Sequence, residues 1–541
     1  MARTIATVIA ESLAAAGITH AFCVPGESYL ALLDAMRDVP VRLVTCRHEA
    51  SASHMAEAAG KLTGKPGVVM VTRGPGATQA AIGLHTAQQD STPLLLLVGQ
   101  VGDDAVGREA FQEMDYHRFF GSIAKQVVTL RDPVRAGEQM ASAIACTLSG
   151  RPGPVVVVLP DDRLGLPSDA PALAPAPIAP PAPEPGAMAE LGRLLDAAQR
   201  PVLVLGGPAW CEADCAQAVT VAERLGLPVL TSWRRKDRFD NCHPHYGGEL
   251  GLGACPPLLE AVREADLLLV VGARLTENET HGYTLFDADF ARTRLVHICA
   301  DAQALGRTFQ PLLAIHAATG PALCALGALA PQGRPEWIAR LSTIHRAWTE
   351  PTQVSSGVNP AAVMRTLSAR LGAAAIIASG AGNFASWVHR FTLHRHLGTQ
   401  LAPVSGAMGY GVPAAIAAAI LRPDRQVVGI SGDGDFLMAG HELATVIHEG
   451  AKPLFLVMDN GQYGTIRMHQ ARDFPGRPSA TRLTNPDFAA LARSYGLHAE
   501  TVRETTAFAP ALERALGRAA LIHCVLDRDE IAPGRRLAQW A

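Results

Sequence analysis

The sequence predicts an α/β protein built from three doubly wound domains with mainly parallel sheets, and three observations lead to this class. Short and almost uninterrupted apolar runs recur along the 541 residues, as expected for strands that are buried on both faces. Segments of helical length and period, such as 48–64, alternate with these runs and indicate βα units. A chain of this length also exceeds what a single hydrophobic core serves.

The apolar runs fall into three groups along the chain. Each run is bounded by Gly, Pro or polar residues, which is typical of strands that end at turns. The runs are GVVMVT at 67–72, PLLLLVG at 93–99, PVVVVLP at 154–160, PVLVLGG at 201–207, DLLLVVGAR at 266–274, AAAIIASG at 373–380, QVVGISGDG at 426–434 and PLFLVMDN at 453–460.

Two breaks divide the chain. The segment 166–186 is rich in Pro and Ala, which favours an extended and semi-rigid connector. A weaker break at 336–357 has turn formers and polar residues on both sides of a short helical segment. The expected domains are therefore residues 1–165, 187–335 and 358–541, each of ordinary domain size.

Composition points to a small-molecule partner. The net charge is −3 and Lys and Arg form no sustained cluster, so we expect no nucleic-acid partner. The ten cysteines make no CxxC pair, which favours reduced thiols in the cytoplasm over zinc sites or disulfides. The first 17 residues lack the pattern of a signal peptide, and no apolar run approaches the ~20 residues of a membrane helix. A soluble, cytoplasmic protein without a membrane partner is expected.

One βαβ unit carries acidic and amide side chains at both strand ends. A strand at 426–431 leads into Gly432, Asp433 and Gly434, a helical spacing follows, and a second strand ends at Asp459 and Asn460. Because both strands of such a unit end at the same edge of the sheet, Asp433 and Asn460 should converge. Hard oxygen ligands of this kind suit Mg²⁺ that is completed by substrate phosphates. The alternative is a Gly-rich turn without a ligand.

The spacing within this unit resembles a known signature. Gly434 and Asp459 enclose 24 residues, and GDG followed after this interval by an Asn pair is typical of thiamine diphosphate (ThDP) enzymes. The first Asn of the pair is Asp459 here. The resemblance implies that Asp433, the Asn460 side chain and the Gln462 carbonyl bind Mg²⁺, whereas Asp459 supports the loop.

The N-terminal third resembles the corresponding domain of acetolactate-synthase-like ThDP enzymes. The resemblance rests on RHEA, which contains Glu49, and on RGPGAT at 73–78. It implies that Glu49 is the carboxylate that protonates the aminopyrimidine ring, so that the C2 proton of the thiazolium is removed. The cofactor itself then carries the difficult carbon chemistry. The alternative for Glu49 is a surface acid that caps a helix.

Other positions match this family one by one. Gln112 would orient a 2-keto acid or stabilise a developing alkoxide, although a solvated loop Gln is the alternative. Met408 would hold the cofactor in its bent shape and the Gly406 carbonyl would accept its amino group; for Met408 the alternative is ordinary core packing. The expected substrate pocket is Val24, Pro25, Gly26, Phe111 and Ile466, and the expected cofactor-binding residues also include Gly382, Asn383, Gly432, Gly434, Asp435, Gly464 and Thr465.

The resemblance spans almost the whole chain. It implies an N-terminal pyrimidine-binding domain, a Rossmann-like middle domain of the transhydrogenase dIII type, and a C-terminal diphosphate-binding domain. In this family the cofactor lies across a subunit interface. A homodimer is therefore the expected minimum, and a homotetramer is expected as the complete assembly.

The resemblance to biosynthetic acetolactate synthases weakens at several positions. His469 stands where biosynthetic acetolactate synthases carry a Trp, and Pro160–Asp162 reads PDD where they have a Lys, so acetohydroxyacid biosynthesis is disfavoured. FAD is compatible with the family but is not predicted, because 272–286 departs from the pattern of FAD-containing relatives.

The predicted function is decarboxylation of a 2-keto acid followed by carboligation to a second keto acid or an aldehyde, with ThDP and Mg²⁺. Two alternatives stay open. One is a lyase or decarboxylase that acts on a larger 2-hydroxy ketone or keto acid. The other is a catalytically silent ThDP-binding subunit with a regulatory or structural role.

Overall fold

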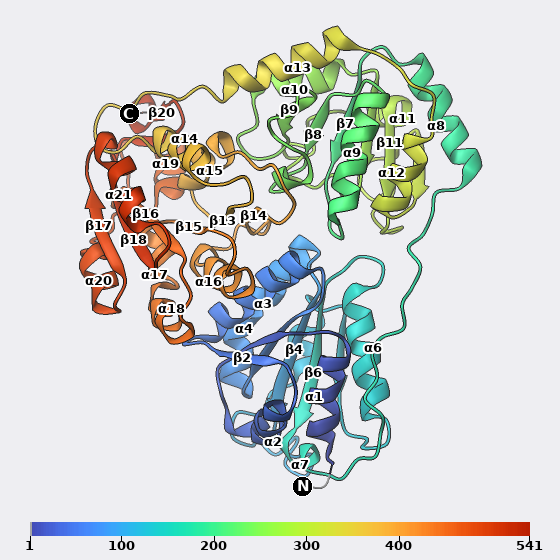
Figure 1. Cartoon of the computed structure of the whole chain (residues 1–541), viewed down its shortest axis with the longest axis vertical. Helices are drawn as coiled ribbons and strands as arrows, with labels where there is room; N and C mark the ends of the chain where they lie inside the picture. The colour runs from blue at the N-terminus through green and yellow to red at the C-terminus, as the bar shows by residue number, and fades with distance from the viewer. Residues whose placement is uncertain (1–2, 541) are drawn as a thin grey trace.

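Three six-stranded sheets, all of parallel strands, form the framework of the molecule (Figure 1). The computed structural model describes residues 3–540; residues 1, 2 and 541, which the sequence assigned to the terminal domains, lie outside it. Helices cover both faces of each sheet, so the predicted class of three doubly wound α/β domains is confirmed. Within residues 3–540, no helix has the length and apolar character needed to cross a membrane.

The N-terminal sheet has the strand order β2-β1-β3-β4-β6-β5. Its strands are β1 His20–Cys23, β2 Arg42–Thr45, β3 Gly67–Val71, β4 Leu94–Gln100, β5 Gln126–Thr129 and β6 Pro154–Pro160. Its helices are α1 Ile5–Ala15, α2 Leu30–Ala35, α3 Glu49–Thr63, α4 Gly74–Asp90, α5 Tyr116–Phe120, α6 Ala136–Leu148 and α7 Asp161–Leu164.

The middle sheet has the order β12-β11-β10-β7-β8-β9, which is the doubly wound order 3-2-1-4-5-6 of Rossmann folds. Its strands are β7 Pro201–Leu205, β8 Val229–Thr231, β9 Tyr246–Glu249, β10 Leu267–Val271, β11 Leu295–Cys299 and β12 Leu313–His316. Its helices are α8 Pro185–Ala197, α9 Glu212–Arg224, α10 Pro256–Glu264, α11 Ala288–Arg294, α12 Thr319–Gly327 and α13 Pro335–Trp348.

The C-terminal sheet, β14-β13-β15-β16-β18-β17, repeats the order of the N-terminal one. Its strands are β13 Ile376–Ser379, β14 Gln400–Leu401, β15 Val427–Gly432, β16 Leu454–Asp459, β17 His498–Val502 and β18 Ala520–Val525. Its helices are α14 Pro360–Arg370, α15 Phe384–Phe391, α16 Gly411–Leu421, α17 Asp433–Leu437, η4 Gly440–Glu442, α18 Leu443–Glu449, α19 Gly464–Asp473, α20 Phe488–Ser494 and α21 Phe508–Ala515, and a hairpin of β19 Glu530–Ala532 and β20 Arg535–Arg536 follows.

The structure shortens both expected connectors. The first runs extended along the outside of the molecule, but α8 already begins at Pro185, where the Glu184 carboxylate accepts two backbone N–H groups of the first turn (Figure 1). In the second, α13 extends to Trp348 and buries Trp337 and Leu341 in the core of the middle domain. Its apolar positions therefore make α13 part of the middle domain rather than a linker.

A buried group of charges lies where the three domains meet. Helix α3 packs against α16, and the Tyr410 hydroxyl at the start of α16 donates to Glu57 Oε2 over 2.7 Å. Lys61 Nζ lies 3.0 Å from Glu57 Oε1 and 3.1 Å from Asp90 Oδ1. From the middle domain, Arg235 Nη2 lies 3.3 Å from the same Asp90 oxygen. Asp90 therefore links all three domains.

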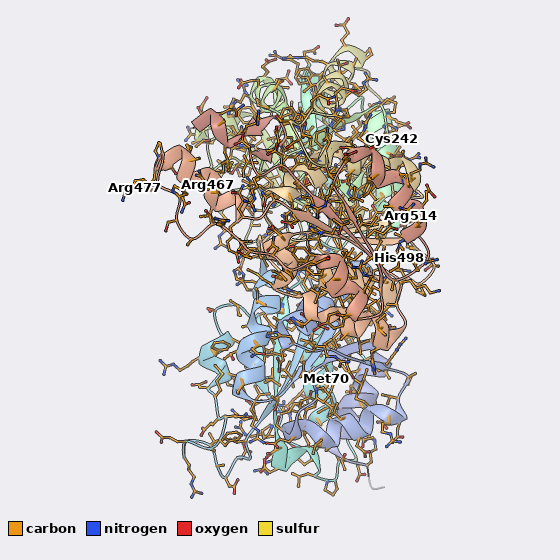
Figure 2. The ribbon with its side chains drawn as sticks, turned by 90° about the vertical axis from the view of Figure 1, so that its left-hand side faces the viewer. Met70, Cys242, Arg467, Arg477, His498 and Arg514 are labelled. Atoms are coloured by element: carbon orange, nitrogen blue, oxygen red, sulfur yellow. The ribbon has the colours of Figure 1, made fainter. Side chains whose placement is uncertain are left out.

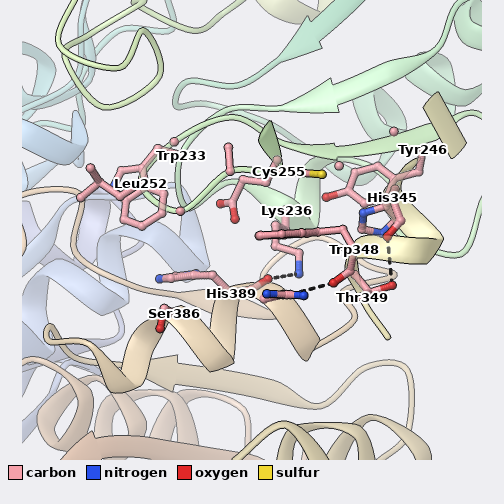
Figure 3. Close-up of a pocket in the computed structure, with 17 residues that line it drawn as sticks. Trp233, Lys236, Tyr246, Leu252, Cys255, His345, Trp348, Thr349, Ser386 and His389 are labelled. Atoms are coloured by element: carbon pink, nitrogen blue, oxygen red, sulfur yellow. Dashed lines mark hydrogen bonds between the residues drawn. The ribbon is translucent and has the colours of Figure 1, made fainter. Parts of the chain in front are cut away.

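A second junction joins the middle and C-terminal domains directly. Figure 3 shows Lys236 reaching from the middle domain to His389 on α15. The Lys236 ammonium donates to the carbonyl oxygens of His389, over 2.7 Å, and Thr392, over 2.6 Å. Burial lowers the pKa of Lys236 to about 8. Its hydrogen bonds hold the end of α15, whose first turn borders the cavity described below.

Replacing Asp90 with Ala should destabilise the protein by about 3–5 kcal/mol, because Lys61 and Arg235 would keep their buried charges without this partner. Thermal unfolding monitored by circular dichroism measures the effect. Glu264→Ala, which removes an exposed ion pair with Arg340, is the control and should leave the melting temperature almost unchanged. Equal melting temperatures for both variants would contradict the linking role of Asp90.

Candidate active site

A cavity of about 240 Å³ opens at the carboxyl ends of the C-terminal strands. Loops after β13, β14, β15 and β16 form it, as expected for the ligand edge of a parallel sheet. The predicted residues that line it are Gly382, Asn383, Gly406, Met408, Gly432, Asp433, Gly434, Asp435, Asn460, Gln462, Gly464, Thr465 and Ile466. The structure thus brings the whole C-terminal set together.

Asp433 begins α17 directly after β15 and is 3% exposed. Its Oδ2 accepts a 2.7 Å hydrogen bond from the side-chain amide of Asn485. Burial raises the pKa of Asp433 to about 6. A Cβ on the next residue, Gly434, would lie 2.6 Å from Cε1 of Tyr463, so a larger residue there would displace the Tyr463 ring. The backbone therefore brings the Asp433 carboxylate to the cavity wall without a neighbouring side chain in the way.

Asp459 supports the loop that carries Asn460. Its carboxylate accepts from Asn485 Nδ2 over 2.8 Å, from the Gly461 amide over 2.9 Å and from His523 Nε2 over 2.9 Å. Burial alone would raise the pKa of Asp459, but the hydrogen bonds from His523 and Gly461 lower it overall. Asn485 therefore bridges the two carboxylates with one amide group.

Asp435 fastens two other loops of the cavity to each other. Its Oδ1 accepts from the Gly409 amide over 2.8 Å and from the Ala381 amide over 3.3 Å. Burial raises the pKa of Asp435 to about 6. A Cβ on Gly380 would lie 2.1 Å from its Oδ2, so the approach of the loop requires glycine. Asp435 thus shapes the cavity from within the wall.

Two helix starts face the cavity. Asn383 occupies the N-cap position of α15 and Tyr463 that of α19, and the first residues of both helices line the cavity. The Thr465 hydroxyl donates to Asn383 Oδ1 over 2.9 Å and joins the two starts. Free backbone N–H groups at helix starts favour phosphate, so this wall is suited to a diphosphate.

The N-terminal candidates gather at a different edge. Val24, Pro25 and Gly26 follow β1, Glu49 begins α3 after β2, and Phe111 and Gln112 follow β4. The residues that line the cavity all fall between 381 and 531, so none of these six is among them. They instead surround the start of α4, where a Cβ on Gly76 would lie 3.3 Å from Glu49 Oε1.

The loop after β4 is fixed by its backbone. Gln112 has a φ of +64° and its carbonyl accepts from the Gly74 amide over 3.1 Å. The neighbouring Phe111 is 72% exposed, and its carbonyl accepts from Arg73 Nη1 over 3.3 Å. The exposed ring of Phe111 therefore stands beside a residue whose backbone is held in place.

Three residues that sequence reasoning missed support the site. Asn485 and His523 hold the acidic loops, and Arg234 of the middle domain donates to the Pro403 carbonyl and, over 3.4 Å, to that of Gly380. Asn485 precedes a Pro, a weak turn signal in the sequence, whereas no local pattern identifies His523 or Arg234.

The oxygen ligands and the helix starts at the cavity fit Mg²⁺ and a phosphorylated cofactor. Within the described residues there is no cluster of three or more His, Cys, Asp or Glu that could form an all-protein metal cage. The cavity instead offers the carboxylate of Asp433, the amide of Asn460 and the backbone of Gln462. Mg²⁺ is commonly held by one or two carboxylates and completed by phosphate oxygens, which the helix starts would bring close.

Models of known families match all three domains. The N-terminal and C-terminal TPP binding domains of thiamine pyrophosphate enzymes match residues 3–119 and 380–524, and the central domain of these enzymes matches 188–326. The chain belongs to the thiamine pyrophosphate enzyme family. Thiamine pyrophosphate is ThDP, so the expectation of a ThDP-dependent enzyme is confirmed.

Similar proteins have related names. The acetolactate synthase large subunit of Parasynechococcus marenigrum is 33% identical over 511 residues, covering 91% of this chain and 82% of that protein. Acetolactate synthase isozyme 2 large subunit of Escherichia coli is 30% identical over 536 residues, covering 96% and 95%. The mitochondrial acetolactate synthase catalytic subunit of Saccharomyces cerevisiae is 29% identical over 526 residues, covering 91% and 76%.

Replacing Asn485 with Ala should weaken Mg²⁺ binding in the presence of ThDP by about tenfold to a hundredfold, as is typical when a group that orients a metal ligand is removed. Without the bridging amide, Asp433 loses its hydrogen bond and faces Asp459 directly. Calorimetric titration with Mg²⁺ measures the change. Thr484→Ala, an exposed neighbour, is the control, and equal dissociation constants for the two variants would refute the role of Asn485.

Proposed function

We propose that the protein catalyses ThDP- and Mg²⁺-dependent decarboxylation of a 2-keto acid followed by carboligation to a second keto acid or an aldehyde. The observation that carries the proposal is the meeting of Asp433, Asn460 and Gln462 with two helix starts in one cavity. The names of the similar acetolactate synthases support the type of reaction.

The C-terminal domain would hold the cofactor. Asp433, the Asn460 side chain and the Gln462 carbonyl would bind Mg²⁺, and the starts of α15 and α19 would bind the diphosphate. Met408 and the Gly406 carbonyl would orient the rings. When bound, ThDP supplies a thiazolium ring that accepts the electron pair released as the bond to the substrate carboxylate breaks.

The N-terminal domain would supply the acid. Glu49 is half-buried, and its side chain makes no hydrogen bond within the described part of the chain, which would leave the carboxylate available to a ligand. Its place outside the cavity of its own chain supports a homodimer, in which Glu49 of one chain completes the cavity of the other. A homotetramer would contain two such pairs.

The reacting face would combine both edges. Gln112, Phe111 and the loop at 24–26 would meet Ile466, which is 53% exposed on α19. Helix α19 projects from the body of the C-terminal domain near Arg467 (Figure 2). His469 stands where biosynthetic relatives carry the Trp that selects the second keto acid, and Pro160–Asp162 also departs from them, so we expect acceptors other than theirs.

The ten cysteines are all free thiols, which suits a reducing compartment, and we propose a cytoplasmic location on this ground. FAD is not part of the proposal.

Purified protein with ThDP, Mg²⁺ and a panel of 2-keto acids should release CO₂, and added aldehydes or keto acids should yield carboligation products identified by mass spectrometry. Release of aldehyde without coupling would favour the lyase or decarboxylase alternative. Inertness toward the entire panel would favour the silent subunit and contradict the proposal.

Glu49→Gln should slow exchange of the C2 proton of bound ThDP by about a hundredfold to ten-thousandfold, because the amide cannot protonate the pyrimidine ring. Quenched-flow proton NMR measures the exchange, and calorimetry should give an almost unchanged ThDP affinity. Glu138→Gln, an exposed acid of the same domain, is the control. Exchange at the normal rate in the Glu49 variant would show that another group activates the cofactor.

A further inference from the structure

A fully buried carboxylate of the C-terminal domain holds the chain immediately before Glu49. Glu442 ends η4 and is 0% exposed. Its Oε1 accepts from the backbone amides of Arg47, over 2.9 Å, and His48, over 3.0 Å. Its Oε2 accepts from the Thr445 hydroxyl over 2.6 Å. Three donors therefore surround one carboxylate at the contact between two domains.

These amides belong to the loop that starts α3. His48 is the N-cap, and its Nδ1 accepts from the Ala50 amide over 3.1 Å. The amides at 47 and 48 precede the helix and have no carbonyl partner within it. Glu442 therefore provides the hydrogen-bond acceptor that the helix cannot provide for these two amides, which belong to the residues directly before Glu49.

A buried carboxylate is expensive unless hydrogen bonds compensate for its desolvation. Backbone amides held by a charged acceptor make strong and directional bonds, which limits how far the loop can move. The Glu49 side chain has no hydrogen-bonding partner of its own among the described residues. The position of the Glu49 carboxylate thus depends on the backbone that Glu442 fixes.

We propose that Glu442 is a positioning residue that sets the geometry of Glu49 and thereby the rate of cofactor activation. The inference rests on the role proposed above for Glu49. Glu442 lies nine positions after Asp433, within the same crossover between β15 and β16. One segment would therefore provide a metal ligand to the cavity of its own chain and align the acid that serves the partner.

Glu442→Ala should slow C2 proton exchange of bound ThDP by about tenfold to a hundredfold, because small displacements of a reacting group carry penalties of this size. The affinity for ThDP with Mg²⁺ should stay within about threefold, since the diphosphate wall is untouched. In turnover, kcat should fall while KM for the keto acid changes little. Glu442→Gln should restore most of the rate, because its Oε1 still accepts both amides.

A variant at the same domain contact separates positioning from general loosening. Glu449 pairs with Arg42 in this contact, and among the described residues it makes no hydrogen bond to the loop at 47–48. Glu449→Gln should exchange at the normal rate, and a loss equal to that of Glu442→Ala would overturn the proposal. If Glu442→Ala does not fold, Glu442→Asp withdraws the carboxylate from the amides and should show the same loss.

Glu49→Gln, measured in parallel, distinguishes a failure of the role of Glu442 from a failure of the role of Glu49. Slow exchange in Glu49→Gln with normal exchange in Glu442→Ala or Glu442→Asp would overturn the role of Glu442 alone. Normal exchange in Glu49→Gln would overturn the role of Glu49 in the proposed function, and with it the reason for a positioning residue.

Discussion

The burial of Asp90 constrains how the three domains can be arranged. Its side chain is fully shielded from solvent and lies between Lys61 of its own domain and Arg235 of the middle domain. It also accepts the Val404 amide, over 3.0 Å, from a loop of the C-terminal domain. A buried charge tolerates few arrangements, because each lost partner leaves an uncompensated ion. The relative placement of the three domains is therefore specific rather than approximate.

This placement lets the middle domain shape a cavity to which it contributes no lining residue. Arg234, next to Arg235, has a φ of +58° and a buried side chain whose pKa falls to about 10 through desolvation. In this strained and buried conformation Arg234 donates to the carbonyls of Gly380 and Pro403, which lie in loops that lead to the cavity. Through Arg234, the middle domain thus supports two loops that lead to the cavity.

Local sequence rules predict the residues that follow a strand in a parallel sheet, and they fail for residues that act across the fold. Asp433 and Asn460 were predictable because the βαβ crossover forces their strand ends to one edge. Asn485 and His523 reach these two loops from distant segments, and Arg234 reaches the loops at Gly380 and Pro403 instead, so only tertiary packing reveals all three. The helix α13 was missed as part of the middle domain because turn formers on both sides masked its apolar face.

The N-terminal and C-terminal sheets share one strand order, so each of them has an edge where candidate site residues can gather. In both sheets the loops that follow the strands gather polar residues at the carboxyl edge, with Glu49 at one edge and Asp433 at the other. The contact between α3 and α16 fixes the two domains of a chain in one orientation, and in it Glu49 stays outside the cavity that Asp433 lines. On the proposed function, a second copy related by a two-fold axis brings each acid to the opposite cavity, because an isologous interface pairs the same two surfaces twice. If the proposed dimer forms, the buried contacts that fix the two domains of one chain would also make the site of each chain depend on its partner.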